Sequence, residues 1–235
     1  MLTDIKKFYN KIMIQNLSKK NNSKIIFTKI YEKNYWGDSE SFSGPGSNNK
    51  NTREIILKLR KICKKYKIKS IVDAPCGDFY WIQKLIKTIE IKYLGLDIVK
   101  KIISDNKKLY SSKNIKFQNI DITKKKIPNC DLIICRDFIF HLSYFDIMRF
   151  FKNLCNCKFK YILISNHFIK KDIKKKFKNQ DIHTGDFRKI NLFDSPFNFL
   201  KNYNFYINDF CDEKKKYLIF FSKKKIRESI KNYLN

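Results

Sequence analysis

IVDAPCGDFYW, at residues 71–81, decides the fold of this chain of 235 residues. Its apolar start, Ile71 to Ala74, predicts a buried strand, and Pro75 and Gly77 predict a tight turn before a helix. In doubly wound α/β sheets, ligands bind beyond the carboxyl ends of the strands, where a turn and a helix N-terminus present backbone N–H groups. Residues 71–81 therefore indicate a ligand-binding turn at the end of a strand.

Short β-forming runs alternate with helical segments through the rest of the chain. Strands are expected at Ser70–Ala74, Tyr93–Ile98, Ile115–Asn119, Asp131–Arg136 and Tyr161–Asn166, and helices at Trp81–Ile89, Val99–Tyr110 and Tyr144–Leu154. Apolar strands separated by single helices predict a parallel sheet covered on both faces, which is a doubly wound α/β domain. Two later runs, Tyr203–Asp209 and Tyr217–Ser222, are close enough to pair as a C-terminal antiparallel hairpin. The expected sheet is seven-stranded and mostly parallel.

Composition divides the chain into three parts. Residues 1–52 form an N-terminal helical extension and a Gly/Ser-rich loop, residues 53–222 the main domain, and residues 223–235 a basic C-terminal tail. The loop, Trp36 to Thr52, is rich in Gly, Ser and Asn, which is typical of irregular structure. Thr52 is expected as the N-cap of a helix whose apolar stripe begins at Ile55 and ends near Tyr66.

The chain is strongly basic, with 51 Lys+Arg against 22 Asp+Glu and a formal net charge of +29. Only six of the basic residues are arginines, and the lysines are spread along the whole length together with many Asn and Ile. Proteins that bind phosphate groups directly favour Arg, which can form two parallel hydrogen bonds, over the single point charge of Lys. A nucleic-acid partner therefore stays open but is not favoured.

Seven cysteines form no CxxC pair and no Cys/His cluster at zinc spacing, so no metal is expected. We interpret them as reduced thiols in a cytoplasmic protein. The longest charge-free apolar run, Tyr161 to Ile169, is too short to span a bilayer. The oligomeric state is not predicted.

Carboxylates follow the first three predicted strands. Asp97, 24 positions after Asp73 (97 − 73), ends the second strand and is suited to bind the two hydroxyls of a ribose. Asp121 follows the third strand and could meet an adenine edge. Two alternatives remain open: Asp97 as a helix N-cap, and Asp121 as the cap of a turn. Three acidic strand ends in one crevice indicate a neutral or cationic nucleoside ligand.

Several motifs, in order, resemble class I S-adenosylmethionine-dependent methyltransferases, and most closely a bacterial and viral branch with a DAPCGDFxW first motif. The shared residues are Trp36-Gly37, Glu40-Ser41, Ser43-Gly44, Gly46-Ser47, Asp73 to Trp81, Cys135-Arg136-Asp137, His141-Leu142-Ser143, Asp181-Ile182, Thr184-Gly185 and Arg188. The resemblance covers about residues 30 to 222. Pro75 and Phe79 stand where the wider family has two glycines.

This resemblance implies the fold, S-adenosyl-L-methionine as cofactor, and methyl transfer, but no particular substrate. The implied cofactor-binding residues are Asp73, Ala74, Cys76, Gly77, Asp97, Ile98, Asp121 and Ile122. We expect an enzyme that methylates an O or N acceptor, either a small molecule or a glycan. The alternatives are methylation of RNA, DNA or protein, and a non-catalytic binding module with the same fold.

Two residues after the fourth strand are candidate catalytic groups. Asp137 could orient or deprotonate the acceptor, although a salt bridge with Arg136 or a nearby lysine is the alternative. His141, just before the expected N-cap Ser143, has an imidazole that titrates in a useful range. Its alternative is a satisfied, partly buried histidine at a helix start.

Two polar segments are expected to form the wall on the acceptor side of the crevice. In the loop at residues 36–47, Trp36 would offer a flat apolar surface and Glu40 a contact for a cation or hydroxyl. In the segment at residues 181–188, Thr184 and Arg188 would contact the acceptor, with Arg188 suited to a carboxylate or phosphate. A lid without acceptor contacts and a plain loop are the respective alternatives.

Overall fold

The computed structural model describes residues 22–36, 38–167, 169, 177–211 and 214–234. The helical extension expected over the first 20 residues lies outside these ranges. None of the described helices has the length and apolar character needed to cross a membrane.

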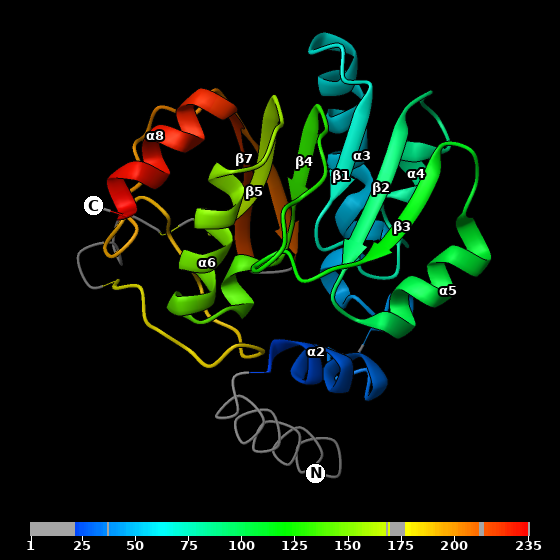
Figure 1. The fold of residues 1–235 in the computed structure, drawn as a ribbon, viewed down its shortest axis with the longest axis horizontal. Coiled ribbons are helices and arrows are strands. Elements are labelled where there is room, and N and C mark those ends of the chain that lie inside the picture. Colours follow the sequence, from blue (N-terminus) through cyan, green and yellow to red (C-terminus); the bar gives the residue numbers. More distant parts are fainter. Residues whose placement is uncertain (1–21, 37, 168, 170–176, 212–213, 235) are drawn as a thin grey trace.

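Seven strands form one sheet at the centre of the molecule (Figure 1). Their spatial order is β3 (Ile115–Asn119), β2 (Lys92–Asp97), β1 (Ser70–Asp73), β4 (Leu132–Cys135), β5 (Tyr161–His167), β7 (Lys214–Ser222) and β6 (Phe205–Cys211). Strands β1 to β5 run parallel, whereas β7 is antiparallel to both β5 and β6. The predicted fold class, with its C-terminal antiparallel hairpin, is confirmed.

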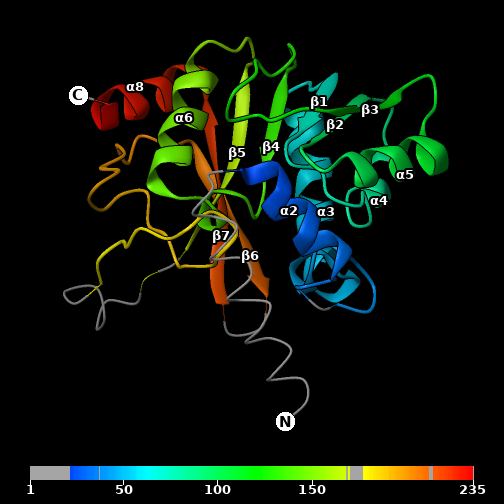
Figure 2. The same cartoon turned by 60° about the horizontal axis from the view of Figure 1, so that its bottom comes forward.

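Helices cover both faces of the sheet. They are α2 (Ser23–Glu32), α3 (Asn49–Lys65), α4 (Gln83–Ile86), α5 (Lys100–Tyr110), α6 (Tyr144–Cys155) and α8 (Lys223–Leu234), with short 3-10 turns at Pro45–Ser47 and Ile139–His141. Helices α6 and α8 pack on one face of the sheet. Helices α3, α4 and α5 pack on the other face (Figure 1). Helix α2 lies across the carboxyl ends of the parallel strands (Figures 1 and 2).

The strands are apolar on both faces because both faces are covered. Along β4, Ile133 points to the core beneath α6 and α8, and its neighbour Ile134 points to the core beneath α3 and α4. Both side chains are fully buried, and such burial stabilises the fold by about 1.5–3 kcal/mol per side chain. The continuous apolar runs that predicted a covered parallel sheet thus build two cores.

Helix starts test the capping predictions. Ser143 caps α6 as expected, because its hydroxyl accepts the backbone N–H of Asp146 at 3.2 Å. The prediction of Thr52 as an N-cap is wrong: α3 begins at Asn49, and the Asn48 side chain caps it. Thr52 lies in the first turn, where its hydroxyl donates to the carbonyl of Asn48 at 2.7 Å. Asn is at least as good an N-cap as Thr, so the helix begins after Asn48, which comes earlier in the chain.

Residues 223–234, set apart in the sequence as a basic tail, form α8. Ile226 and Ile230 on this helix are fully buried in the core beneath α6. Its lysines are exposed or partly exposed, which is the usual arrangement of a surface helix.

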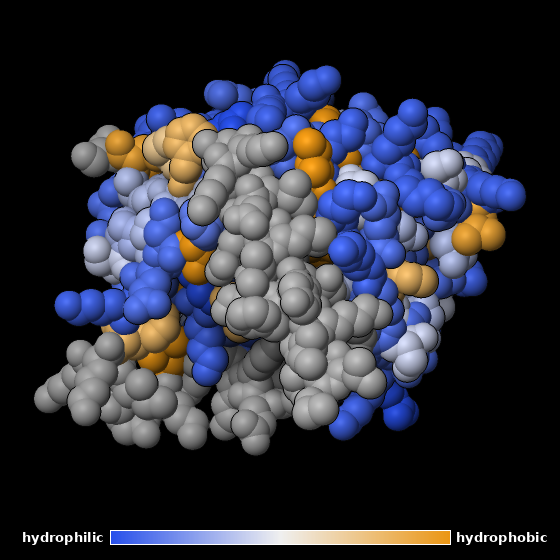
Figure 3. Space-filling view, turned by 90° about the horizontal axis from the view of Figure 1, so that it is seen from below, coloured by the Kyte–Doolittle hydropathy of each residue, from blue (hydrophilic) through white to orange (hydrophobic). Residues whose placement is uncertain are grey.

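Lysine is almost entirely a surface residue in the part of the chain whose burial is described. Hydrophilic side chains dominate the described part of the face seen from below, with a few separate apolar patches (Figure 3). Among the residues whose burial is described, Lys216 on β7 is the single buried lysine, at 4% exposure.

Candidate functional site

The turn after β1 is shaped by two residues with left-handed backbone. Gly77 has φ +54°, and a Cβ at this position would lie 2.1 Å from the hydroxyl oxygen of Ser43, so only glycine fits. Phe79 has φ +61° although it carries a large side chain. Its ring is 1% exposed and packs 4.9 Å from Tyr93 and 5.1 Å from Phe117, measured between ring centroids. This packing holds the turn where the wider family has glycine.

Asp97, at the end of β2, is held against this turn. Its Oδ2 accepts the N–H of Gly77 at 3.2 Å, and its Oδ1 accepts the N–H of Val99 at 2.9 Å. The residue is 6% exposed, and burial raises the pKa of its carboxyl to about 6, against the lowering effect of these N–H groups. Asp97 therefore joins the turn of β1 to the start of α5 and also faces the neighbouring cavity.

Asp73 lies beneath the turn rather than in the cavity. Its Oδ2 accepts the hydroxyl of Tyr93 at 2.9 Å, and its Oδ1 is buried without a hydrogen-bond partner. Burial raises the pKa of this carboxyl to about 7, although Tyr93 and Arg136 both lower it. A buried oxygen without a hydrogen-bond partner lowers the stability of the folded state, so the Asp73 side chain is held unfavourably directly under the turn.

A first cavity opens at the carboxyl ends of β1, β2 and β4. Of the eight residues implied to bind cofactor, Cys76, Gly77, Asp97 and Ile98 line it, and Asp121 and Ile122 line a small cavity that adjoins it. Ala74 is fully buried in the core and, like Asp73, lines neither. Phe27 and Tyr31 of α2 form the cover of the first cavity. Asp121 also caps a turn, because its Oδ1 accepts both the N–H and the hydroxyl of Thr123.

A second cavity lies beside the first and shares part of its wall. Four residues line both cavities: Trp36, Ser43, Asp137 and His141. The loop at residues 43–46 and the segment at residues 185–187 border the second cavity, together with His167 at the end of β5. The two segments that the sequence assigns to an acceptor wall are thus brought to one cavity.

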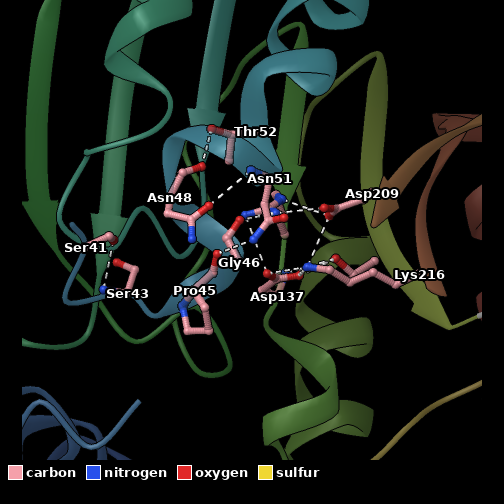
Figure 4. Close-up of polar contacts among 12 residues, drawn as sticks. Ser41, Ser43, Pro45, Gly46, Asn48, Asn51, Thr52, Asp137, Asp209 and Lys216 are labelled. Atoms are coloured by element: carbon pink, nitrogen blue, oxygen red, sulfur yellow. Dashed lines mark hydrogen bonds and ion pairs between the residues drawn. The ribbon is translucent and has the colours of Figure 1, made fainter. Parts of the chain in front are cut away.

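Asp137 belongs to a network of four charged groups (Figure 4). The Lys216 ammonium lies 2.5 Å from both oxygens of Asp137 and 3.3 Å from Oδ2 of Asp209. Arg136 donates to both oxygens of Asp209 at 2.8 Å and to the carbonyl of Gly46 at 2.6 Å. A Cβ on Gly46 would lie 2.6 Å from Oδ2 of Asp137, so the loop can approach the network this closely only with glycine.

The network determines the charge state of Asp137. Burial alone would raise the pKa of this carboxyl, but Arg136 and Lys216 outweigh it and hold the pKa below its usual value. Its backbone is left-handed, with φ +53°, and its N–H donates to the hydroxyl of Ser165 at 2.9 Å. Asp137 is therefore an ionised, fixed carboxylate, and the salt bridges that the sequence left open are present.

His141 is a neutral imidazole in the shared wall. Its Nδ1 lies 2.9 Å from the carbonyl oxygen of Asp186, which can only accept, so Nδ1 carries the proton and Nε2 the lone pair. Burial lowers the pKa of the ring to about 4. The ring lies 5.1 Å from that of Trp36, measured between centroids. His141 can hold a hydrogen bond from an acceptor group at Nε2.

The other predicted acceptor contacts line neither cavity. Glu40 is exposed and accepts the N–H of Asn49 at 2.9 Å. Thr184 is buried and donates to Asp146 at 2.7 Å. Arg188 is buried and donates to the carbonyl of Leu142 at 2.6 Å, and burial lowers its pKa to about 10. These side chains fasten the surrounding loops instead of lining a cavity.

Sequence reasoning missed four residues that shape the site: Asp78, His167, Asp209 and Lys216. Asp78 accepts hydrogen bonds from the hydroxyls of Ser41 and Ser43 and from the N–H of Phe42, which fixes the loop to the first motif. The hairpin register pairs Asp209 with Lys216, and symmetric pairing about the turn could have revealed that opposed charge pair. Within the described ranges, no group of three or more His, Cys, Asp or Glu could hold a metal ion.

No protein-family profile and no curated protein match the sequence. Solved structures do match its fold. Magnesium protoporphyrin IX methyltransferase (ChlM) from Synechocystis PCC 6803, with bound SAH, is 12% identical with a TM-score of 0.58, covering 86% of this chain and 99% of that one. The N-methyltransferase NodS from Bradyrhizobium japonicum WM9, in complex with S-adenosyl-L-homocysteine, is 12% identical with a TM-score of 0.56, covering 82% and 97%.

A third similar structure is the methyltransferase domain of bacterial CtHen1, at 13% identity and a TM-score of 0.55, covering 72% of this chain and 98% of that one. At such low identity these likenesses concern the fold. Together with the strand order, they show that this chain has the Rossmann-like fold of class I S-adenosylmethionine-dependent methyltransferases.

Proposed function

We propose that this protein is an S-adenosylmethionine-dependent methyltransferase that acts on an O or N acceptor, either a small molecule or a glycan. The observation that carries the proposal is Asp97, a buried carboxylate fixed to the Gly77 turn at the wall of the first cavity. This turn lies at the end of β1, next to β4, where the strand order reverses: β2 and β3 follow on one side, and β5 on the other. Ligands of such sheets usually bind at this point.

The residues around the first cavity fit a nucleoside with a positive charge. Asp97 can accept hydrogen bonds from two ribose hydroxyls, since each carboxylate oxygen has more than one lone pair. Gly77 lets the ligand approach the backbone, and Asp121 and Ile122 can border an adenine edge from the adjoining cavity.

When bound, S-adenosylmethionine supplies a methyl group on a positively charged sulfur, which keeps the electrons of the breaking C–S bond. The chain must align the acceptor atom with that bond and exclude water, and alignment alone removes much of such a barrier. Trp36 and His141 stand where the two cavities meet. We assign His141 Nε2 to hold, and then take, the acceptor proton, and Asp137 to orient the acceptor as a fixed carboxylate.

Titration calorimetry with S-adenosylhomocysteine tests the proposal. The wild-type protein should bind it, and Asp97→Ala should weaken binding at least about tenfold because charge-assisted hydrogen bonds are lost. Glu54→Ala is the matched control, since Glu54 is an exposed carboxylate on α3 that pairs with Lys58 and lines neither cavity. Absence of binding by the wild-type protein, or equal binding by Asp97→Ala, would overturn the proposal.

A further inference from the structure

Among the described residues at or next to the second cavity, two cations, Lys216 and Arg136, are already paired with carboxylates. The three N–H groups of the Lys216 ammonium are taken up by the two oxygens of Asp137 and by Asp209. The Arg136 guanidinium is bonded to Asp209 and Gly46. A phosphate or carboxylate entering here would have to displace one of these bonds before it could pair with either cation.

Aromatic rings line much of the remaining wall. Phe140 lies 4.7 Å from the His141 ring and 4.9 Å from the His167 ring, and Phe187 lies 5.5 Å from Phe140, all between centroids. Trp36 closes the side next to the first cavity. Such a lining favours a flat, apolar body in the ligand.

Among the described polar groups that line this cavity, His167 has a buried ring nitrogen without a hydrogen-bond partner. Its Nδ1 accepts the N–H of Ile190 at 3.2 Å, so the proton of the neutral ring is on Nε2. Burial lowers the pKa of this imidazole to about 3, which keeps it neutral at ordinary pH. His167 is 1% exposed, and Nε2 has no hydrogen-bond partner. A buried N–H without a partner is unfavourable, and a ligand oxygen would satisfy it.

We propose that the methyl acceptor is an uncharged molecule with a flat ring and a hydroxyl group, and that one of its oxygens accepts the hydrogen bond of His167 Nε2–H. This inference rests on the proposed function, because it identifies the second cavity as the acceptor site. His167 is then a specificity-determining residue: it favours an oxygen acceptor over an apolar molecule of the same shape. The paired cations select against phosphorylated acceptors.

Three probes of similar shape test the charge and the hydrogen bond: phenol, phenyl phosphate and toluene. Each is titrated into the full-length protein saturated with S-adenosylhomocysteine, and the ring nitrogens of ¹⁵N-labelled histidines are followed by NMR. Phenol should shift the His167 signals saturably, with phenyl phosphate and toluene each binding at least about five times more weakly, the effect of one hydrogen bond or more. Equal or tighter binding of phenyl phosphate, or no effect of phenol on His167, would overturn the inference.

A variant separates the hydrogen bond from ring packing. His167→Phe keeps a flat ring but removes the donor, so it should lose the preference for phenol over toluene while binding S-adenosylhomocysteine like the wild type. A variant that keeps the preference contradicts the role of Nε2–H. If the variant fails to fold, the wild-type comparison of phenol with toluene still decides. Failure of wild-type S-adenosylhomocysteine binding would instead refute the proposed function itself.

Discussion

Replacing Asp97 by Asn should change how the stability of the protein depends on pH. Burial raises the pKa of Asp97 from 3.8 to about 6 in the folded chain. The folded state therefore binds more protons than the unfolded state between these values, and the Asp97 contribution to stability falls as pH rises through them. Each pKa unit corresponds to about 1.4 kcal/mol, so the full loss is about 3 kcal/mol.

Asn does not titrate, so Asp97→Asn escapes this loss. The free energy of unfolding of the variant, relative to the wild type, should rise by about 2–2.5 kcal/mol between about pH 4 and pH 7.5, since a small part of the loss already falls below pH 4. Urea unfolding of both proteins at several pH values measures this difference. Titrations of His141 and His167 are common to both proteins and cancel to first order, whereas Asp73, whose pKa the Asp97 charge raises, titrates closer to its usual value in the variant and adds to the difference. A difference that stays constant over this range would refute the burial penalty.

The same substitution should weaken ligand binding. The amide keeps the shape of the side chain but loses the negative charge, and hydrogen bonds to a charged group are worth about 1.5–3 kcal/mol each. We expect S-adenosylhomocysteine to bind Asp97→Asn about 10- to 100-fold more weakly at pH 7.5. A variant that is both more stable at neutral pH and weaker in binding would show that the site retains charge at the expense of stability.

Three further substitutions test other parts of the site. Lys216→Met leaves the Asp137 carboxylate short of a buried partner and should lower the free energy of unfolding by about 3–5 kcal/mol in urea, whereas a loss below about 1 kcal/mol would mean that the network is solvated. Gly77→Ala forces a Cβ toward Ser43 in left-handed backbone, so it should cost about 1–2 kcal/mol and reduce S-adenosylhomocysteine affinity in calorimetry; unchanged affinity would argue against close approach at this turn. Asp78→Ala should speed hydrogen exchange of the loop amides at residues 41–43 about tenfold or more, and unchanged protection would show that the loop is held by other contacts.

The sequence predicts the sheet well because strand signals and core burial are local and mutually consistent. The end of β1, the turn at Gly77 and the cap at Ser143 lie where the pattern puts them. Helix α3 starts earlier than expected, because two good capping residues, Asn48 and Thr52, compete and the pattern does not rank them.

The candidate site is less predictable because its charge pairing depends on long-range geometry. Asp137 and Lys216 are 79 positions apart, and the lysine belongs to a basic run that resembles a solvated strand end. Only the antiparallel register of β5 and β7 places Lys216 opposite His167, toward the interior of the site. Arg188 shows the converse: a cation in a suggestive motif is buried and donates to the carbonyls of Phe140 and Leu142.

The burial of a single described lysine has a consequence for how this sequence can evolve. Genomic base composition can enrich Lys at exposed positions, because each exchange there alters only solvated charge. At the network the requirement is different: Arg136 must present a planar fork to Asp209, and Lys216 a compact ammonium to two carboxylates. A change in base composition can therefore alter the number of surface lysines without altering the charge pairs of the network. Proteins of this fold that differ widely in net charge can keep the same buried charge pairs.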